Sequence, residues 1–436
     1  MTSKRTFTAF PVGNTDLCKQ QLLNWASRFS SCCFLDNNNY QMPGTRLECL
    51  AGVGEYETIR AMAGEAFSTL SDFHARHRDW IFGHLGYDLK NELEPLESRL
   101  PDPAGFPDLH FFVPLYLVML KPGELVIGTL GKRAEEIWEE IMHAPPENTA
   151  RPGREALPVP TARFTRSAYL EAIRHLQEHI LRGDCYEITF CQEFFMEDIE
   201  VDPLSVYKQL AVLSPNPSCA YYAFDDHYLL CASPERYLQN QGGKLLSQPI
   251  KGTARRWPDD PVRDRHEKET LHASAKERSE NVMIVDLVRN DLSKVCREGS
   301  VQVEELWGIY AFPQVFQMIS SVTGILEPSH SWLDAIKATF PMGSMTGAPK
   351  RRVMELIERY ELTKRGLYSG AVGYIDPDGN FDFNVVIRSI LYNKASRYLS
   401  FPTGSAITVA SDPIKEYTEC LLKATAMKKA LEGEGL

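Results

Sequence analysis

Strand-like and helix-like segments alternate along the whole chain without the regular strand–helix–strand period of a parallel sheet. Short apolar runs typical of buried strands occur at 31–35, 47–53, 110–120 and 185–195. Amphipathic spacing predicts helices at 56–75, 166–182, 274–297, 349–360 and 412–431. This irregular interleaving favours an α+β fold with largely antiparallel sheets over a doubly wound parallel sheet.

A proline-rich stretch at 144–161 is the clearest candidate boundary. It carries five prolines among polar residues, which is typical of a linker between two lobes. A chain of 436 residues is also long enough for either one very large domain or two. We therefore distinguish an N-terminal region, residues 1–150, from a second region, residues 162–434.

Composition excludes several classes of protein. The net charge of -11 argues against nucleic acid as the main partner. The ten cysteines are irregularly spaced, which suits reduced thiols in the cytoplasm rather than a disulfide framework or a zinc site. No run of about 18 apolar residues predicts a membrane span, and the first residues lack the apolar core of a signal peptide.

The stretch Pro249-Ile250-Lys251-Gly252-Thr253 is the first candidate for chemistry. Gly252 permits an unusual backbone angle or a close approach beside the lysine. A lysine becomes a nucleophile when burial or nearby cations lower its pKa, and the pair 255–256 (Arg-Arg) could supply such cations. The alternative is a surface lysine in a basic turn, because most lysines are exposed.

Two predicted helices each carry a pair of glutamates three residues apart, and such residues share one helix face. Glu277 and Glu280 stand near the start of one helix, and Glu416 and Glu419 near the start of the last. Together the two faces could offer oxygen ligands to a hard cation such as Mg²⁺. The alternatives are ordinary helix capping for Glu277 and an exposed salt bridge from Glu419 to Lys423.

Two further segments could bind an anion. Ser344 and Thr346 precede a predicted helix that has proline in its first turn, and free hydroxyl and N–H groups there bind carboxylates or phosphates. Arg388 falls on the polar face of a predicted strand, with Asp382 and Asn384, where it could clamp a carboxylate. The alternatives are capping by Thr346 and a cross-strand ion pair of Arg388.

These blocks together resemble the chorismate-utilising enzymes, and among them most closely the aminodeoxychorismate synthases (component I, the para-aminobenzoate synthase large subunit). The resemblance is strong from about residue 164 to 431. The matching segments are 233–236 (Ser-Pro-Glu-Arg), 249–253, 280–291, 340–350, 367–370 and 411–413. The family's fold is one large α+β body of two mainly antiparallel sheets wrapped by helices, which would make 144–161 an internal loop and 162–434 the catalytic part.

The resemblance implies roles for particular residues. Lys251 matches a lysine that attacks the substrate ring at C2, where anthranilate synthases have alanine, and Glu235 matches the general acid/base. Glu280 and Glu416 match direct Mg²⁺ ligands, with Glu277 and Glu419 beside them. Substrate contacts are implied for Ser344, Thr346, Tyr368, Arg388, Gly404 and Lys423.

Further implications concern the reaction and its nucleophile. The chain lacks a glutaminase cysteine motif, so ammonia would come from a glutamine amidotransferase subunit or from free ammonium, in para-aminobenzoate and folate synthesis. Glu187 stands where the water-adding isochorismate and salicylate synthases carry a lysine, which argues against water as nucleophile. Gln317 and Ala406 depart from a histidine and a glycine of the family. Competing interpretations are an anthranilate synthase, isochorismate-type chemistry and a non-catalytic binding protein.

Overall fold

Two long strands, β3 (Cys49–Ala61) and β5 (Leu109–Lys121), pair antiparallel along their length and connect the two halves of the fold. The computed structural model describes residues 5–40, 44, 47–145, 157–312 and 315–433. The register of β3 and β5 shifts between Glu55 and Glu57, near Pro114, and a bulge of this kind bends a strand pair. On either side of the bulge, the two halves of the pair belong to different sheets.

The first sheet extends from the halves of β3 and β5 around Val53 and Tyr116. β5 pairs with β6 (Glu124–Thr129), which pairs with β1 (Thr6–Pro11). From β3 the order continues through β2 (Ser31–Asp36), β9 (Ser218–Phe224), β10 (His227–Ser233), β19 (Ser389–Asn393), β20 (Tyr398–Ile407) and β8 (Glu187–Met196). The short strands β7 (Thr161–Ala162) and β16 (Gly347–Ala348) pair with opposite ends of β8.

The second sheet begins where β4 (Ile81–Leu85) pairs with the other half of β5. It continues through β17 (Ala371–Ile375), β18 (Phe381–Val385), β11 (Arg236–Gln241), β12 (Lys244–Gln248) and β15 (Val315–Ile325). β13 (Ile250–Arg255) and β14 (Gln302–Ala311) also pair with β15. Every strand pair described is antiparallel, so the predicted α+β fold of two mainly antiparallel sheets is confirmed, and the two sheets are continuous through β3 and β5.

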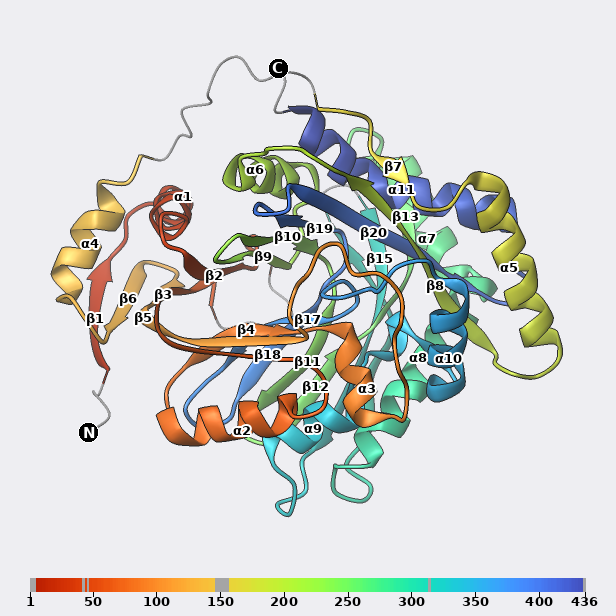
Figure 1. The fold of residues 1–436 in the computed structure, drawn as a ribbon, viewed down its shortest axis with the longest axis horizontal. Coiled ribbons are helices and arrows are strands. Elements are labelled where there is room, and N and C mark those ends of the chain that lie inside the picture. Colours follow the sequence, from red (N-terminus) through yellow and green to blue (C-terminus); the bar gives the residue numbers. More distant parts are fainter. Residues whose placement is uncertain (1–4, 41–43, 45–46, 146–156, 313–314, 434–436) are drawn as a thin grey trace.

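Helices cover the sheets. α1 (Thr15–Ala26), α4 (Ala134–Met142), α6 (Pro203–Leu213) and α11 (Pro413–Glu432) share one apolar core with the first sheet. α2 (Ala66–His77), α8 (Ala275–Ser293) and α9 (Trp332–Thr339) share a second core with strands of both sheets, and α2 and α9 lie below the strands in Figure 1. The other helices are α3 (Lys90–Leu93), α5 (Arg166–Leu181), α7 (Pro261–Ala273) and α10 (Lys350–Tyr360).

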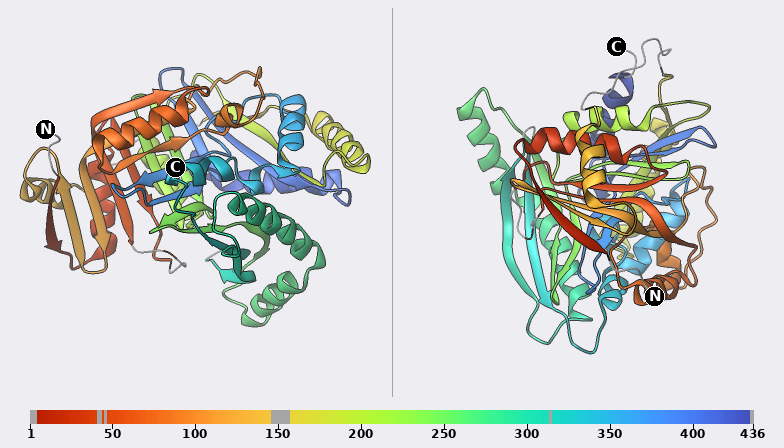
Figure 2. Two further views of the ribbon diagram at one scale, coloured as in Figure 1. Left: turned by 90° about the horizontal axis from the view of Figure 1, so that it is seen from below. Right: turned by 90° about the vertical axis from the view of Figure 1, so that its left-hand side faces the viewer.

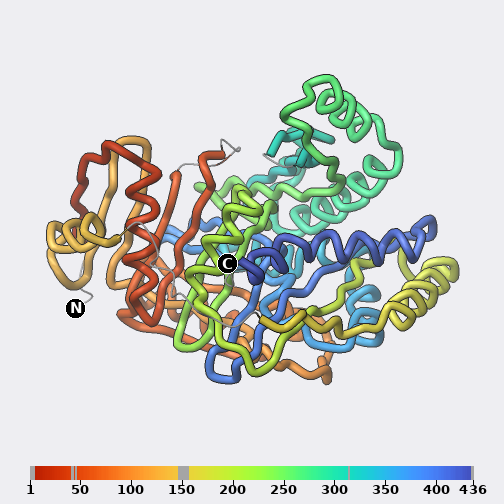
Figure 3. The backbone as a smooth tube through the Cα atoms, turned by 90° about the horizontal axis from the view of Figure 1, so that it is seen from above, coloured from red at the N-terminus to blue at the C-terminus, as the bar shows by residue number. Residues whose placement is uncertain are grey.

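Strand residues alternate between these two cores. On β9, Tyr222 belongs to the second core, which contains α2, α8 and α9. Tyr221 and Ala223 belong to the first core, which contains α1, α4, α6 and α11. Leu229 and Leu230 of β10 divide in the same way, as the period of two along a strand requires. The views in Figure 2 show this layering from two further sides, and Figure 3 shows that the segment with α7 and α8 projects beside α11.

The structure corrects the helix predicted at 56–75. β3 continues through Ala61, and the helix α2 starts only at Ala66. Residues 57–61 pair one by one with the apolar strand β5, so tertiary pairing overrides the weak helical spacing of this segment. Most of the predicted linker, residues 146–156, lies outside the described residues. In the described part of the chain, no helix is long and apolar enough to cross a membrane.

Candidate active site

Lys251 is largely enclosed and paired with an acid, so the interpretation as a surface lysine is wrong. Its Nζ donates a hydrogen bond to Glu187 Oε1 at 2.7 Å, and its side chain is 12% exposed. The predicted special conformation of Gly252 is confirmed by its φ of 93°. A Cβ atom there would lie 3.0 Å from Glu277 Oε2, so glycine lets β13 approach α8 closely.

The pKa of Lys251 moves in the direction opposite to the one predicted from neighbouring arginines. Burial lowers the pKa, but the negative charges of Glu187 and Glu280 outweigh burial and raise it above its ordinary value. The arginines point elsewhere: Arg255 stacks on Trp257, and Arg256 pairs with Asp264. Lys251 is therefore an ammonium ion at neutral pH in the absence of substrate.

Glu235 has the properties of a general acid/base. It lies between β10 and β11, is 5% exposed, and its Oε1 accepts a hydrogen bond from Ser344 Oγ at 2.6 Å. Burial raises the pKa of Glu235 to about 7, although the hydrogen bond from Ser344 and the charge of Lys251 hold it down. A carboxyl group of this kind can both give and accept a proton near neutral pH.

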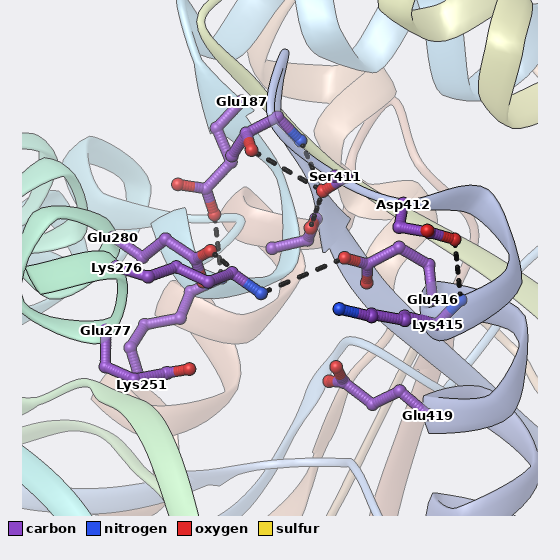
Figure 4. A network of polar contacts seen from close by, with 12 residues as sticks. Glu187, Lys251, Lys276, Glu277, Glu280, Ser411, Asp412, Lys415, Glu416 and Glu419 are labelled. Carbon is purple, nitrogen blue, oxygen red and sulfur yellow. Dashed lines mark hydrogen bonds and ion pairs between the residues drawn. The ribbon is translucent and has the colours of Figure 1, made fainter. Parts of the chain in front are cut away.

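The two acidic helix faces approach each other across one space, Glu277 and Glu280 from α8 and Glu416 and Glu419 from α11 (Figure 4). Lys276 Nζ lies between them, 3.6 Å from Glu280 Oε1 and 4.0 Å from Glu416 Oε1. Glu280 Oε1 is buried without a hydrogen-bond partner among the described residues. Opposed carboxylates of this kind need a cation between them.

These carboxylates fit Mg²⁺ in their chemistry, because Mg²⁺ prefers oxygen ligands and often binds only one or two carboxylates plus substrate oxygens and water. The fit is incomplete in geometry. In the ranges that the structure describes, no three His, Cys, Asp or Glu side chains gather closely enough to hold an ion. The predicted metal site stays a prediction, with an ammonium group between Glu280 and Glu416 in this structure.

The alternative interpretations of the two helix starts are partly confirmed. Ser274 caps α8 by accepting a hydrogen bond from the Glu277 backbone N–H. Lys423 Nζ lies 2.7 Å from Glu419 Oε1, which is the predicted salt bridge, and it also donates to Gly404 O at 2.8 Å. Burial raises the pKa of Glu419, but the charge and hydrogen bond of Lys423, together with the charges of Lys276 and Lys251, outweigh burial and lower the pKa below its ordinary value.

Ser344 lies in a tight turn, η2 (Gly343–Met345), and Thr346 directly follows this turn, so neither residue is at the cap of α10. Pro349 occupies the cap position, so the predicted capping by Thr346 is wrong. Thr346 is fully buried, and its carbonyl oxygen accepts a hydrogen bond from the Thr189 backbone N–H at 2.7 Å. The turn therefore docks on β8 and directs Ser344 at Glu235.

Arg388 does not lie on a strand, contrary to the prediction. β18 ends at Val385, and Arg388 follows in a bend with a φ of 52°. Asp382 on β18 pairs with Arg236 instead. Burial lowers the pKa of Arg388, and Tyr368 and Glu419 oppose this effect, which places Arg388 near both. In the part of the chain described, Arg388 is half-buried and has no ion pair, so its guanidinium is available to an anion.

Gly404 on β20 has a packing reason to be glycine. A Cβ atom there would collide with Cys191 Sγ and would lie 2.7 Å from Phe190 O. Tyr368 is also buried and lies near the same cysteine, with its hydroxyl 3.8 Å from Cys191 Sγ. Both residues therefore border the middle of β8, at Cys191.

Arg365 and Glu361 support the site and were missed by sequence reasoning. Their five hydrogen bonds use every N–H of Arg365: two reach Glu361, and the others reach Met345 O, Thr189 O and Ser369 Oγ. The pair thus joins the turn that carries Ser344 to β8. Their spacing of four residues just after α10 was the available signal, but the same spacing is common in surface salt bridges.

A separate cavity of about 410 Å³ lies between β2, β11 and β18, and none of the predicted site residues lines it. The predicted residues gather instead where α8 and α11 approach β8 and β13.

Comparison with known proteins identifies the class. Residues 30–429 match the model of the chorismate binding enzyme family, so the chain belongs to that family of enzymes, which act on chorismate. It is 32% identical to aminodeoxychorismate synthase component 1 of Bacillus subtilis (80% of this chain, 76% of the relative). It is 33% identical to anthranilate synthase component 1 of Thermus thermophilus (86% and 83%).

Solved structures show the same fold. Anthranilate synthase component I from Streptococcus pneumoniae superposes with a TM-score of 0.76 at 24% identity, covering 89% of this chain and 93% of that one. The menaquinone-specific isochorismate synthase from Escherichia coli superposes with a TM-score of 0.75 at 17% identity (99% and 95%). The family is thus established, whereas the relatives differ in the reaction that their names give.

Proposed function

We propose that the protein is component I of an aminodeoxychorismate synthase, which converts chorismate and ammonia to 4-amino-4-deoxychorismate for para-aminobenzoate and folate synthesis. The observation that carries the proposal is the position of Lys251: a largely enclosed primary amine beside Glu187, with the charges of Glu235 and Glu280 acting on it. A nucleophilic role needs such an amine close to an acid that can protonate the leaving group. The alanine that anthranilate synthases carry at this position cannot supply it.

The cationic side chains of the site suit a substrate that carries two carboxylates. Arg388 has no ion pair within the described residues, and Lys423 reaches the site from α11. An unpaired guanidinium is a favourable partner for a carboxylate because it can form two parallel hydrogen bonds. We assign substrate contacts to Ser344, Thr346, Tyr368, Gly404, Arg388 and Lys423. These local cations explain how a chain with a net charge of -11 can bind a dianion.

The proposed reaction has two displacements. The ammonium of Lys251 first loses a proton to water. Its uncharged amine then bonds to ring carbon C2, both ring double bonds shift by one position, and the C4–O bond breaks while Glu235 gives its proton to the departing hydroxyl. Ammonia then bonds to C4, both double bonds shift back, and the C2–N bond breaks, which frees the amine of Lys251 to take up a proton again. The products are 4-amino-4-deoxychorismate and water.

Mg²⁺ would be held by Glu280 and Glu416, with Glu277 and Glu419 beside them. When bound, the ion would neutralise and orient the ring carboxylate of the substrate. Ammonia would come from a glutamine amidotransferase subunit. The name "component 1" of the relatives is consistent with a second component.

The test is product analysis. Purified protein with chorismate, Mg²⁺ and an ammonium salt should form 4-amino-4-deoxychorismate, and Lys251→Ala should slow its formation and release some anthranilate. Lys244→Ala is the control, because Lys244 is an exposed lysine on the neighbouring strand β12. Anthranilate as the main wild-type product would instead support the second candidate, an anthranilate synthase, to which similarity is equally high. Unchanged product and rate in Lys251→Ala would refute covalent participation of the lysine.

A further inference from the structure

We propose that Glu187 binds the incoming ammonium and delivers it to the ring, an inference that rests on the proposed function. Glu187 is the first residue of β8, and only 1% of its side chain is exposed. Its two carboxylate oxygens have different surroundings. Oε1 accepts the hydrogen bond from Lys251, whereas Oε2 is buried and has no partner among the residues that the structure describes.

Glu280 Oε1 also lacks a hydrogen bond, but it has the ammonium of Lys276 at 3.6 Å, and two other buried glutamates beside β8 use both of their oxygens. Glu193, on the same strand, uses both oxygens: Tyr398 donates to Oε1 and Arg163 to Oε2, each at 2.7 Å. Both oxygens of Glu361 likewise accept hydrogen bonds from Arg365. Buried carboxylate oxygens are rarely left without a donor, so the free oxygen of Glu187 indicates a donor that arrives with the reactants.

The chemistry of the reactants selects this donor. The carboxylates of chorismate carry no N–H and are repelled by an anionic oxygen. Ammonium carries only N–H donors and a positive charge, and charge-assisted hydrogen bonds to carboxylates are the strong ones. The free oxygen belongs to the same carboxylate that holds Lys251.

The proton balance closes with groups already in the site. Ammonium bound at Oε2 gives one proton to Glu235, which has lost its own to the departing hydroxyl. The nitrogen lone pair then forms the bond to C4 as the C2–N bond of Lys251 breaks. The net reaction is chorismate plus ammonium to 4-amino-4-deoxychorismate, with its amine protonated, plus water.

The experiment measures initial rates of amination with ammonium chloride, without an amidotransferase, for wild type, Glu187→Gln, Glu187→Asp and Glu193→Gln. Glu187→Gln keeps the size of the side chain and removes its charge. We expect the KM for ammonium to rise about tenfold or more in Glu187→Gln, because a hydrogen bond to a charged group is lost, with a KM for chorismate close to that of wild type. Glu187→Asp should restore part of the ammonium affinity. Glu193→Gln, a matched neutralisation of a buried glutamate on β8, should leave the KM for ammonium unchanged.

The opposite change in the two KM values overturns the inference. A raised KM for chorismate with an unchanged KM for ammonium in Glu187→Gln assigns the free oxygen to the substrate ring. An unchanged ammonium KM in both Glu187 variants also overturns it. If wild type forms anthranilate, the proposed function is wrong and the ammonium KM still decides the role of Glu187. Failure of wild type to aminate chorismate at all overturns both.

Discussion

Replacement of Ser344 by alanine should change the pH at which the enzyme stops working. The Ser344 hydroxyl donates a 2.6 Å hydrogen bond to the buried Glu235 carboxylate, and this bond stabilises the ionised form. A hydrogen bond to a charged group contributes about 1.5–3 kcal/mol. Its loss therefore corresponds to a rise of about one to two units in the pKa of Glu235.

The direction of the change in pH dependence follows from the role of Glu235 as an acid. The active form is protonated, and burial places its pKa at about 7, so wild-type activity should fall as pH rises above 7. In Ser344→Ala this fall should move to higher pH, even if the absolute rate is lower because a substrate contact is lost. The ratio of variant to wild-type kcat/KM should therefore rise between about pH 6 and pH 9.

The assay follows chorismate consumption at saturating ammonium across this pH range. Taking the ratio to wild type at each pH cancels the titration of ammonium itself. Ser233→Ala is the control, because Ser233 Oγ contacts the backbone N–H of Glu235 at 3.2 Å and not its carboxylate. A flat ratio for Ser344→Ala, or a fall that moves to lower pH, would refute the assignment of Glu235 as the acid.

Three other predictions concern stability and positioning. Burial lowers the pKa of His84 to about 4, so the unfolded chain takes up a proton first as pH falls below 6.5. The free energy of unfolding should drop by about 2 kcal/mol between pH 7.5 and pH 5, and less so in His84→Gln, as measured by urea denaturation. Gly252→Ala should lower the melting temperature more than Gly243→Ala. Both glycines have positive φ, but only Gly252 has a neighbour, Glu277, in the way of a Cβ atom; equal losses would show that the contact is unimportant. Arg365→Lys should lower kcat/KM at least tenfold, because the ammonium group of lysine cannot make the five directed hydrogen bonds of the guanidinium. A kcat/KM equal to that of wild type would show that the turn carrying Ser344 keeps its position without Arg365.

Local patterns in the chain were sufficient for many elements. The helix start at Asp412 and Pro413 was predictable because the acidic cap and the first-turn proline act within four residues. The hairpin of β5 and β6 was equally readable from two apolar runs around Pro122-Gly123. The segment 56–61 misled, because its strand conformation depends on β5, about fifty residues away in sequence.

The residues of the site were also predictable only in part. Lys251, Glu235 and the paired glutamates could be selected as candidates from residue type, spacing and resemblance, because chemistry needs those groups. Their partners could not be: the bond of Lys251 to Glu187 joins residues 64 apart, and that of Ser344 to Glu235 joins residues 109 apart. The raised pKa of Lys251, opposite to the one expected from the adjacent arginines, is a product of these distant acids.

The amino-acid order alone thus determined the α+β class, the caps of α8 and α11 and the kinds of side chain available for catalysis, since these depend on interactions within a few residues. Only the tertiary structure decided which carboxylate faces which cation, where Arg388 points, and that one oxygen of Glu187 is left free. The physical reason is that burial and long-range pairing set the charge of each group and leave particular hydrogen-bond acceptors without a donor. Burial and pairing of this kind arise only when β8, β13, α8 and α11 come together.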